Sequence, residues 1–224
     1  MARGFVIAID GPAASGKGTI AVGLGRELRL PVLDSGLLYR AVAVTLLREG
    51  GDPADAAAAE ARARALDKDR LDDPAFRTRE AGEAASQAAV HPGVRTALRD
   101  FQRAFADQEG GAVIDGRDIG TVIVPDAPAK LFVTASPEAR AERRFRQLRG
   151  QGEGVVYEDI LADIRRRDER DMGRAAAPLV RADDAALLDT TSMSISEAAD
   201  AARRIVEVAR ARWEASQRGK SNRA

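Results

Sequence analysis

The chain has 224 residues, of which 35 are basic and 35 acidic, so its formal net charge is zero. A neutral chain creates no global field that would draw it to nucleic acid or to a membrane surface, and we expect neither as a partner. The absence of cysteine excludes disulfides and thiolate metal sites. Because no apolar run reaches about 18 residues and no signal-peptide pattern is present, we expect a cytoplasmic protein.

Apolar and helical patterns alternate along the chain. Strands are expected at Phe5–Asp10, Val32–Asp34, Ala112–Asp115, Lys130–Thr134 and Ala185–Asp189. Helices are expected at Lys17–Leu28, Leu37–Arg48, Ala54–Ala65, Arg79–Val90, Val94–Glu109, from Ser136 to the glycines that start at Gly150, at Tyr157–Asp171, and from Ser194 to about Ala215. A turn at His91-Pro92-Gly93 separates two of these helices. The alternation predicts an α/β fold, with a parallel sheet and helices on both faces.

The chain is predicted to be one domain of residues 1–224 with two insertions. The core comprises 1–53, 106–148 and 175–217, the insertions are 54–105 and 149–174, and a frayed tail follows at 218–224.

A glycine-rich segment follows the first strand and precedes a helical pattern. Its residues are Gly11, Pro12, Ala13, Ala14, Ser15, Gly16, Lys17, Gly18 and Thr19. This context is that of a phosphate-binding P-loop, because backbone N–H groups of the turn and of the helix N-terminus converge on one anion. Lys17 adds a mobile positive charge. Gly18 follows the lysine and the hydroxyl comes later, at Thr19, a form more typical of small-molecule kinases than of GTP switches.

Two charged segments follow the second and third expected strands, at the carboxyl edge where α/β proteins bind ligands. In the first, Ser35 can cap a helix or touch a phosphate, and Arg40 lies one turn into that helix. The second is Asp115-Gly116-Arg117-Asp118, which begins with an acid where P-loop folds commonly hold magnesium. A charged tetrapeptide directly after a buried strand favours a functional site over ordinary surface.

The second insertion has two interpretations that the residues alone leave open. Gly150–Gly154 provides hinge freedom, and Arg167, Asp171 and Arg174 follow at spacings of four and three. Dense mixed charge is typical of a solvated helix face with i,i+4 pairs. It is equally what a closing lid needs, because its guanidinium groups arrive with the motion.

Five motifs in order resemble the bacterial cytidylate kinases, a family of nucleoside monophosphate kinases. They are Ile9-Asp10-Gly11-Pro12 with the P-loop, Leu33-Asp34-Ser35-Gly36 with Tyr39-Arg40, Ala85-Ser86-Gln87, Asp115-Gly116-Arg117-Asp118, and Arg167-Asp168-Glu169-Arg170-Asp171. The resemblance implies transfer of the ATP γ-phosphate to CMP or dCMP. It also implies a P-loop NTPase core with a five-stranded sheet in the order 2-3-1-4-5, a monophosphate-binding region and a lid.

The resemblance also implies roles for individual residues. The P-loop holds the donor phosphates, and Lys17, Arg117, Arg167 and Arg174 are the expected catalytic groups. CMP is expected to meet Ser86, Arg95 and Asp118 at its base, Arg40, Arg117 and Arg174 at its phosphate, and Arg167 and Asp171 at its sugar, with Ser35 and Tyr39 completing the site. Magnesium is expected near Thr19, Asp34 and Asp115, mostly through water. The family likeness suggests a monomer.

One departure from the family pattern is visible. Many bacterial members carry a small three-stranded sheet in the monophosphate region, but between Leu66 and Arg79 there is no room for three ordinary strands. The chain is therefore expected to be a short form in which helices cover the substrate.

The chemistry of the acceptor agrees with the residues. A phosphate monoester has a second pKa of about 6, so it is already a dianion near neutral pH and needs no general base. The single histidine, His91, lies in the His-Pro-Gly turn. Arginines, the P-loop lysine and Mg²⁺ supply the neutralisation that two phosphate groups require. The alternatives are a UMP, AMP or shikimate kinase, or a nucleotide- or nucleic-acid-binding module.

Overall fold

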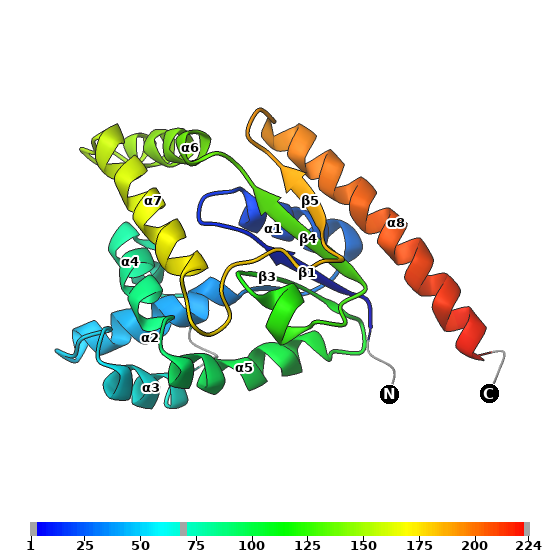
Figure 1. Ribbon diagram of the computed structural model, residues 1–224, viewed down its shortest axis with the longest axis horizontal. Coiled ribbons are helices and arrows are strands. Elements are labelled where there is room, and N and C mark those ends of the chain that lie inside the picture. The colour runs from blue at the N-terminus through cyan, green and yellow to red at the C-terminus, as the bar shows by residue number, and fades with distance from the viewer. Residues whose placement is uncertain (1–3, 68–70, 222–224) are drawn as a thin grey trace.

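The computed structural model describes residues 4–67 and 71–221, and its centre is a five-stranded sheet (Figure 1). The strands lie in the order β2-β3-β1-β4-β5, and every neighbouring pair is parallel. Their bounds are Val6–Asp10 (β1), Val32–Asp34 (β2), Ala112–Gly116 (β3), Ala129–Thr134 (β4) and Ala186–Asp189 (β5). The predicted parallel sheet and its strand order are confirmed.

Helices surround the sheet and make up most of the remaining chain. They are Lys17–Leu28 (α1), Ser35–Arg48 (α2), Ala56–Arg64 (α3), Arg79–Ala88 (α4), Pro92–Ala106 (α5), Pro137–Gly150 (α6), Tyr157–Met172 (α7) and Ile195–Ser221 (α8), with short turns at Pro74–Arg77 (η1) and Ile119–Ile123 (η2). Over residues 4–67 and 71–221, no helix is both long enough and apolar enough to cross a membrane.

Several helix boundaries differ from the expectation by one to six residues, and two of the helix starts have a clear local cause. Asp34 is the N-cap of α2 and accepts a hydrogen bond from Leu37 N, so this helix begins at Ser35 and not at Leu37. Pro92 begins α5 because a proline at the first helical position loses no intrahelical hydrogen bond. The expected His-Pro-Gly turn is therefore a helix start.

The last helix is longer than expected at its C-terminal end. It continues to Ser221, beyond Ala215, and residues 222–224 lie outside the described part of the chain. Residues 216–221 include no proline, and the turn before them is stabilised by an i,i+4 ion pair between Arg210 and Glu214. The expected frayed tail is therefore helical from residue 218 to residue 221. At the other end the capping box between Ser194 and Glu197 is confirmed, since each backbone N–H donates to the other's side chain.

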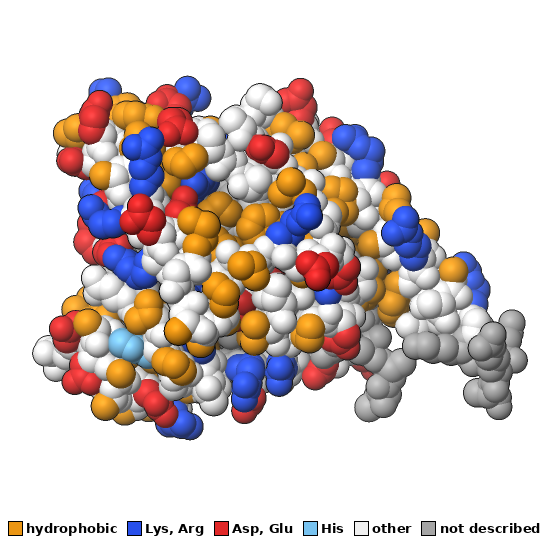
Figure 2. Space-filling view, in the orientation of Figure 1, with side chains coloured by type: hydrophobic (Ala, Val, Ile, Leu, Met, Phe, Trp, Pro, Cys, Tyr) orange, Lys and Arg blue, Asp and Glu red, His pale blue; other side chains and the backbone are white. Residues whose placement is uncertain are grey.

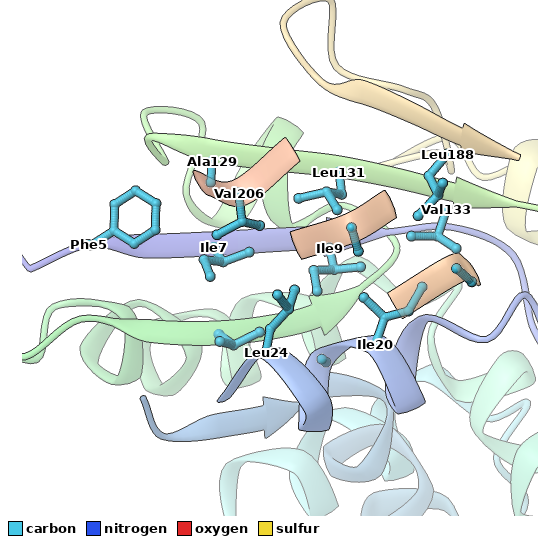
Figure 3. Close-up of a cluster of buried hydrophobic side chains, with 14 residues drawn as sticks. Phe5, Ile7, Ile9, Ile20, Leu24, Ala129, Leu131, Val133, Leu188 and Val206 are labelled. Carbon is cyan, nitrogen blue, oxygen red and sulfur yellow. The ribbon is translucent and has the colours of Figure 1, made fainter. Parts of the chain in front are cut away.

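The central strand β1 is buried on both faces, as its continuous apolar sequence predicts. Ile7 and Ile9 pack with α1 and α8 on one face of the sheet (Figure 3). Val6 and Ala8 pack on the other face against residues of α5 and η2. This double cover leaves the carboxyl ends of the strands as the open edge of the sheet.

The segment 54–105 lies beside this edge and is helical wherever the structure describes it. It contributes α3, η1, α4 and α5, and no strand occurs in its described residues. Leu38 and Val42 of α2 pack against α3, α4 and α5 in one apolar cluster. The sheet-free arrangement agrees with the expected short form.

Asp10 ends β1 and joins the central strand to η2. One of its carboxylate oxygens accepts from Ile119 N and the other from Gly120 N, each at 2.7 Å. Burial raises the pKa of Asp10 to about 7, although both backbone N–H groups act to lower it. The folded protein therefore binds a proton at Asp10 more tightly than the unfolded chain does.

We expect Asp10→Asn to lower the free energy of unfolding by about 1–3 kcal/mol near pH 5, because the amide leaves one buried N–H without an acceptor. Between the ordinary Asp pKa and about 7 the folded state holds the extra proton, so wild-type stability falls as pH rises. The variant lacks this dependence, and its deficit should shrink towards pH 8. Urea unfolding of both proteins from pH 5 to pH 8 measures this.

Asp200→Asn is the matched control, because Asp200 forms only an exposed ion pair with Arg203. Its effect should stay below about 1 kcal/mol at every pH. A deficit of Asp10→Asn that grows with pH would mean that Asp10 is held as the anion.

Candidate active site

The P-loop connects β1 to α1 at the open edge of the sheet. Gly16 has φ 91°, a conformation that favours glycine, and a Cβ on Gly11 would collide with the Val133 carbonyl oxygen. Ala14 also has a positive φ, of 59°, which costs strain in a residue with a Cβ. The turn is thus tightly wound, and the loop reaches α1 with the N-terminal N–H groups of the helix free to meet an anion. The strained alanine was not anticipated from the sequence.

Lys17 is the first residue of α1 and is buried. Its ammonium group donates to the Pro12 carbonyl oxygen at 3.4 Å. Burial lowers the pKa of Lys17, Arg117 lowers it further, and the carboxylates of Asp115 and Asp34 oppose this. A bound phosphate would restore the charge partner that this ammonium group lacks.

Asp115 lies on β3 opposite Ile9 of β1 and Asp34 of β2. Burial raises the pKa of Asp115, and its Oδ1 atom has no hydrogen-bond partner among the described residues. An unpartnered, buried carboxylate oxygen beside the P-loop suits a hydrated divalent cation. Over the described parts of the chain, no group of three or more His, Cys, Asp or Glu side chains could hold a metal directly.

Asp34 is more fully engaged than the sequence suggested. It accepts from Leu37 N at 3.2 Å and from the Arg40 guanidinium at 2.6 Å. Burial acts to raise the pKa of Asp34, but Arg40 and Lys17 outweigh it, so the pKa lies below the ordinary value. Of the three residues expected near magnesium, Asp34 therefore has the strongest competing contacts.

A cavity of about 610 Å³ opens on one side of the P-loop. The loop residues from Ala14 to Ile20 form one wall, and α6 contributes the Arg143, Arg144 and Gln147 side chains. The opposite wall, at the start of α8, carries the apolar side chains of Met193 and Ile195. Basic groups beside the loop and an apolar wall beyond them match the phosphates and the base of a nucleotide.

A second, much smaller cavity of about 40 Å³ lies between α2, α4, α5, β3 and α7. It brings together nine of the ten residues expected to contact CMP: Ser35, Tyr39, Ser86, Arg95, Arg117, Asp118, Arg167, Asp171 and Arg174. The tenth, Arg40, lines an adjoining cavity of about 420 Å³ between the P-loop, α4, α6 and α7, which Arg167 also lines.

The inner end of the small cavity carries a buried ion pair. Arg95 donates to the Asp118 carboxylate, and its guanidinium lies 5.7 Å from the centre of the Tyr39 ring. The Ser86 hydroxyl beside them is buried without a partner among the described residues. These groups offer a carboxylate, a guanidinium and a hydroxyl to the edge of a small polar ring.

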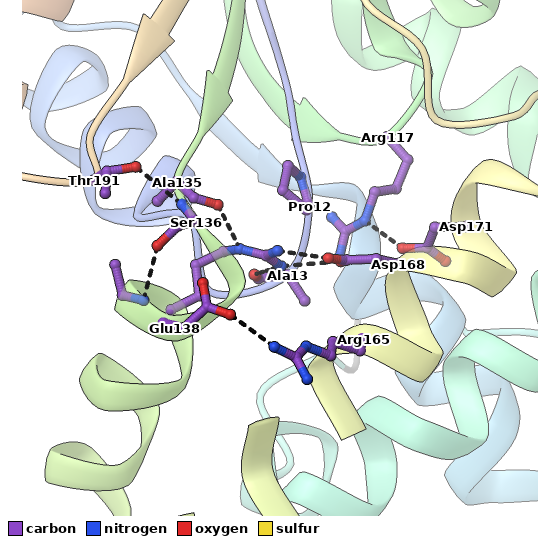
Figure 4. A network of polar contacts seen from close by, with 12 residues as sticks. Pro12, Ala13, Arg117, Ala135, Ser136, Glu138, Arg165, Asp168, Asp171 and Thr191 are labelled. Carbon is purple, nitrogen blue, oxygen red and sulfur yellow. Dashed lines mark hydrogen bonds and ion pairs between the residues drawn. The ribbon is translucent and has the colours of Figure 1, made fainter. Parts of the chain in front are cut away.

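Asp171 of α7 joins two of the expected phosphate-binding arginines. It accepts from Arg117 Nε at 2.8 Å (Figure 4). It also accepts from Arg174, which follows the end of the helix. Burial acts to raise the pKa of Asp171, but the two guanidinium groups hold it below its ordinary value. The carboxylate of Asp171 thus pairs with two guanidinium groups at the small cavity.

Arg167 differs from its neighbours because it makes no hydrogen bond to any described residue, and its Nε atom is buried. Burial, reinforced by Arg117, lowers its pKa to about 10. The placement of Arg167 and Asp171 at the cavity favours the lid interpretation of α7 over a solvated helix face.

Sequence reasoning missed the residues that tie α7 and β5 to the P-loop. The buried Arg140 of α6 donates to the Ala13 carbonyl oxygen at 3.2 Å and forms a two-bonded ion pair with Asp168 of α7. Thr190, directly after β5, donates to the Ser15 carbonyl oxygen at 3.1 Å and accepts from Arg143. Their position just after the carboxyl ends of β4 and β5 was the available signal.

Comparison with known proteins agrees with this geometry. The family model described as cytidylate kinase matches residues 7–208. A cytidylate kinase of Caulobacter sp. (strain K31) is 66% identical over 209 residues, covering 93% of this chain and 97% of that protein. One from Xanthobacter autotrophicus is 64% identical over 207 residues, covering 92% and 99%.

Among solved structures, an uncharacterized protein from Eubacterium ventriosum is similar in fold, with a TM-score of 0.53 and 17% identity over 91% of this chain and 98% of that one. The family match spans the P-loop, the small cavity and α7 alike, and the chain belongs to the cytidylate kinase family.

Proposed function

We propose that the protein transfers the γ-phosphate of ATP to CMP or dCMP, giving ADP and CDP or dCDP. The observation that supports this proposal is the pair of cavities at the open edge of the sheet, one lined by the P-loop and one lined by nine of the expected acceptor residues, in a chain of the cytidylate kinase family. The larger cavity takes ATP, and the smaller takes the monophosphate after it opens.

In this proposal the base of CMP is recognised by Asp118, Arg95 and Ser86. The exocyclic amine of cytosine donates to a carboxylate, whereas uracil presents an oxygen at the same edge. A carboxylate that faces an oxygen is left unpaired in a buried site, which costs several kcal/mol. The unpartnered Ser86 hydroxyl then gains a hydrogen bond from the bound nucleotide.

The sugar of CMP contacts Arg167 and Asp171. The rest of the acceptor site consists of Ser35, Tyr39, Arg40, Arg117 and Arg174. The acceptor phosphate is already a nucleophilic dianion at neutral pH, so no side chain needs to remove a proton. The work of the site is to hold two mutually repelling phosphates in line. Four positive side chains offset the repulsion between the two phosphates: Lys17, Arg117, Arg167 and Arg174.

Kinases of this kind use ATP with a divalent metal, and we assign Mg²⁺ here. Asp115 and Thr19 would hold it, largely through water, with Asp34 in a lesser role because Arg40 already occupies its carboxylate. When bound, the ion neutralises charge on the donor phosphates. We further propose that the protein works as a monomer in the cytoplasm.

A substrate panel tests the proposed function. ADP release is measured with ATP and each of CMP, dCMP, UMP, AMP and shikimate. We expect the highest kcat/KM with CMP or dCMP. A clear preference for AMP, UMP or shikimate would place the chain's activity elsewhere among the P-loop kinases, and no acceptor-dependent ADP release at all would favour a binding role.

Replacement of the P-loop lysine tests the donor site. We expect Lys17→Ala to lower kcat by at least about 10²-fold, because a preorganised charge at the transferred phosphate is lost. Steady-state kinetics with CMP and ATP measure the effect, and thermal melting checks the fold. Near-normal turnover in a well-folded variant would exclude Lys17 from the mechanism.

Replacement of the base-reading acid tests selectivity. Asp118→Asn keeps the shape but adds a donor, so we expect the CMP-over-UMP ratio of kcat/KM to narrow by at least about tenfold, which is about 1.4 kcal/mol. Competition between the two nucleotides at fixed ATP measures this ratio. If both substrates slow equally, Asp118 serves the geometry of the phosphates and the base is read by other residues.

A further inference from the structure

The acceptor-site helix α4 carries a stripe of functional side chains on one face. Arg79, Gly82, Glu83 and Ser86 follow at spacings of three, one and three, which places them along the same side of the helix. Ser86 ends the stripe inside the small cavity. The other three residues lie towards α7, beside which α4 runs (Figure 1).

The lid helix α7 carries a matching stripe. Asp163, Arg167 and Arg170 follow at spacings of four and three. Arg79 Nε donates to Asp163 Oδ2 at 3.0 Å, and Arg170 Nη2 donates to Glu83 Oε1 at 2.8 Å. The two ion pairs have opposite polarity, so a shift of one helix along the other would bring like charges together. Figure 2 shows basic and acidic side chains interspersed over this side of the molecule.

Gly82 lies between the two ion pairs and faces Arg167. A Cβ on Gly82 would lie 3.2 Å from Arg167 Nη1, tighter than ordinary van der Waals contact. Glycine inside a helix is unfavourable by about 1 kcal/mol relative to alanine. The glycine at position 82 leaves room for the guanidinium group of Arg167, which makes no hydrogen bond to a described residue.

We propose that Arg79 and Glu83 are positioning residues for the acceptor nucleotide, which hold α4 in register with α7 so that Ser86 and Arg167 close together on CMP. This inference rests on the proposed function. It adds two residues, Arg79 and Glu83, that are not among the expected CMP contacts. The side chains of the four ion-pair residues are 25–39% exposed, so water only partly screens the two interactions.

The small cavity gives the reason for a reversible contact. Its volume of about 40 Å³ holds only a few water molecules, so the base of a nucleotide fits only after the surrounding elements, α4 and α7 among them, move apart. The ion pairs then re-form over the bound nucleotide. The donor cavity is lined by the P-loop, α6 and the start of α8 instead, so the contact favours retention of CMP over retention of ATP.

A double-mutant cycle tests the proposal. Arg79→Gln, Asp163→Asn and the double variant should each raise the KM for CMP about fivefold, while the KM for ATP changes less than twofold. Asp163 also pairs with Arg166 of its own helix, so the double variant should be no worse than Asp163→Asn alone, which already removes the interaction with Arg79. Arg79→Lys should restore most of the wild-type KM. Hydrogen exchange should show less CMP-induced slowing in α4 and α7 of the double variant than of the wild type.

The control variant removes a positive side chain from α7 that points towards α6. Arg165 is exposed and donates to Glu138 of α6 at 2.8 Å (Figure 4), and it forms no ion pair with a described residue of α4, so Arg165→Gln should leave both KM values unchanged. Equal changes in both KM values, additive single effects, or no change would overturn the proposal. A wild-type enzyme that forms no ADP with CMP would overturn the proposed function as well.

Gly82→Ala gives a second test that does not depend on loss of folding. The methyl group favours the helix, and Arg167 can yield by a few tenths of an ångström, so we expect unchanged or raised thermal stability. Because the guanidinium moves from its place, kcat/KM for CMP should fall at least threefold. A stabilised variant with full activity would show that the space beside Gly82 has no role in transfer.

Discussion

The parallel pairing of β1 with both β3 and β4 is the constraint on which the site depends. It aligns Ile9 with Asp115 and Asp10 with Gly116, so the P-loop and the charged segment after β3 leave the sheet side by side. The strands are held by burial on both faces, where Ile7 and Val6 of one strand face different helix layers. Loss of this register would separate the P-loop from Arg117, which we propose binds the acceptor phosphate.

Asp10 extends this constraint beyond the sheet. Its carboxylate binds the first two N–H groups of η2, which directly follows Asp118. Asp118, which we propose reads the base, therefore lies between β3 on one side and a turn tied to β1 on the other. A buried acid with two backbone donors costs desolvation, but it supplies a rigid base for the ion pair between Asp118 and Arg95.

Helix α7, the proposed lid, contacts both halves of the site. Asp168 reaches the P-loop through Arg140, Asp171 holds Arg117 and Arg174 at the acceptor cavity, and Asp163 meets α4. Several guanidinium groups in one small volume repel one another unless anions lie between them. The carboxylates of α7 supply those anions in the protein itself, and Arg167, which has no such partner among the described residues, is the cation left for a phosphate or a sugar.

Local sequence was sufficient for the fold class and the P-loop, because these depend on strand and helix periodicity and on glycine positions. It placed Arg95, Asp118 and Asp171 in one site only through resemblance to a family, since they lie on three separate segments that nothing local brings together. The start of α2 at Ser35 and the end of α8 at Ser221 differ from the positions expected from the sequence, because capping and neighbouring contacts decide where a helix begins and ends. The tertiary structure alone decided the partners of Arg140, Thr190 and Arg79, because an ion pair across 84 positions, as between Arg79 and Asp163, leaves no periodic pattern in the chain.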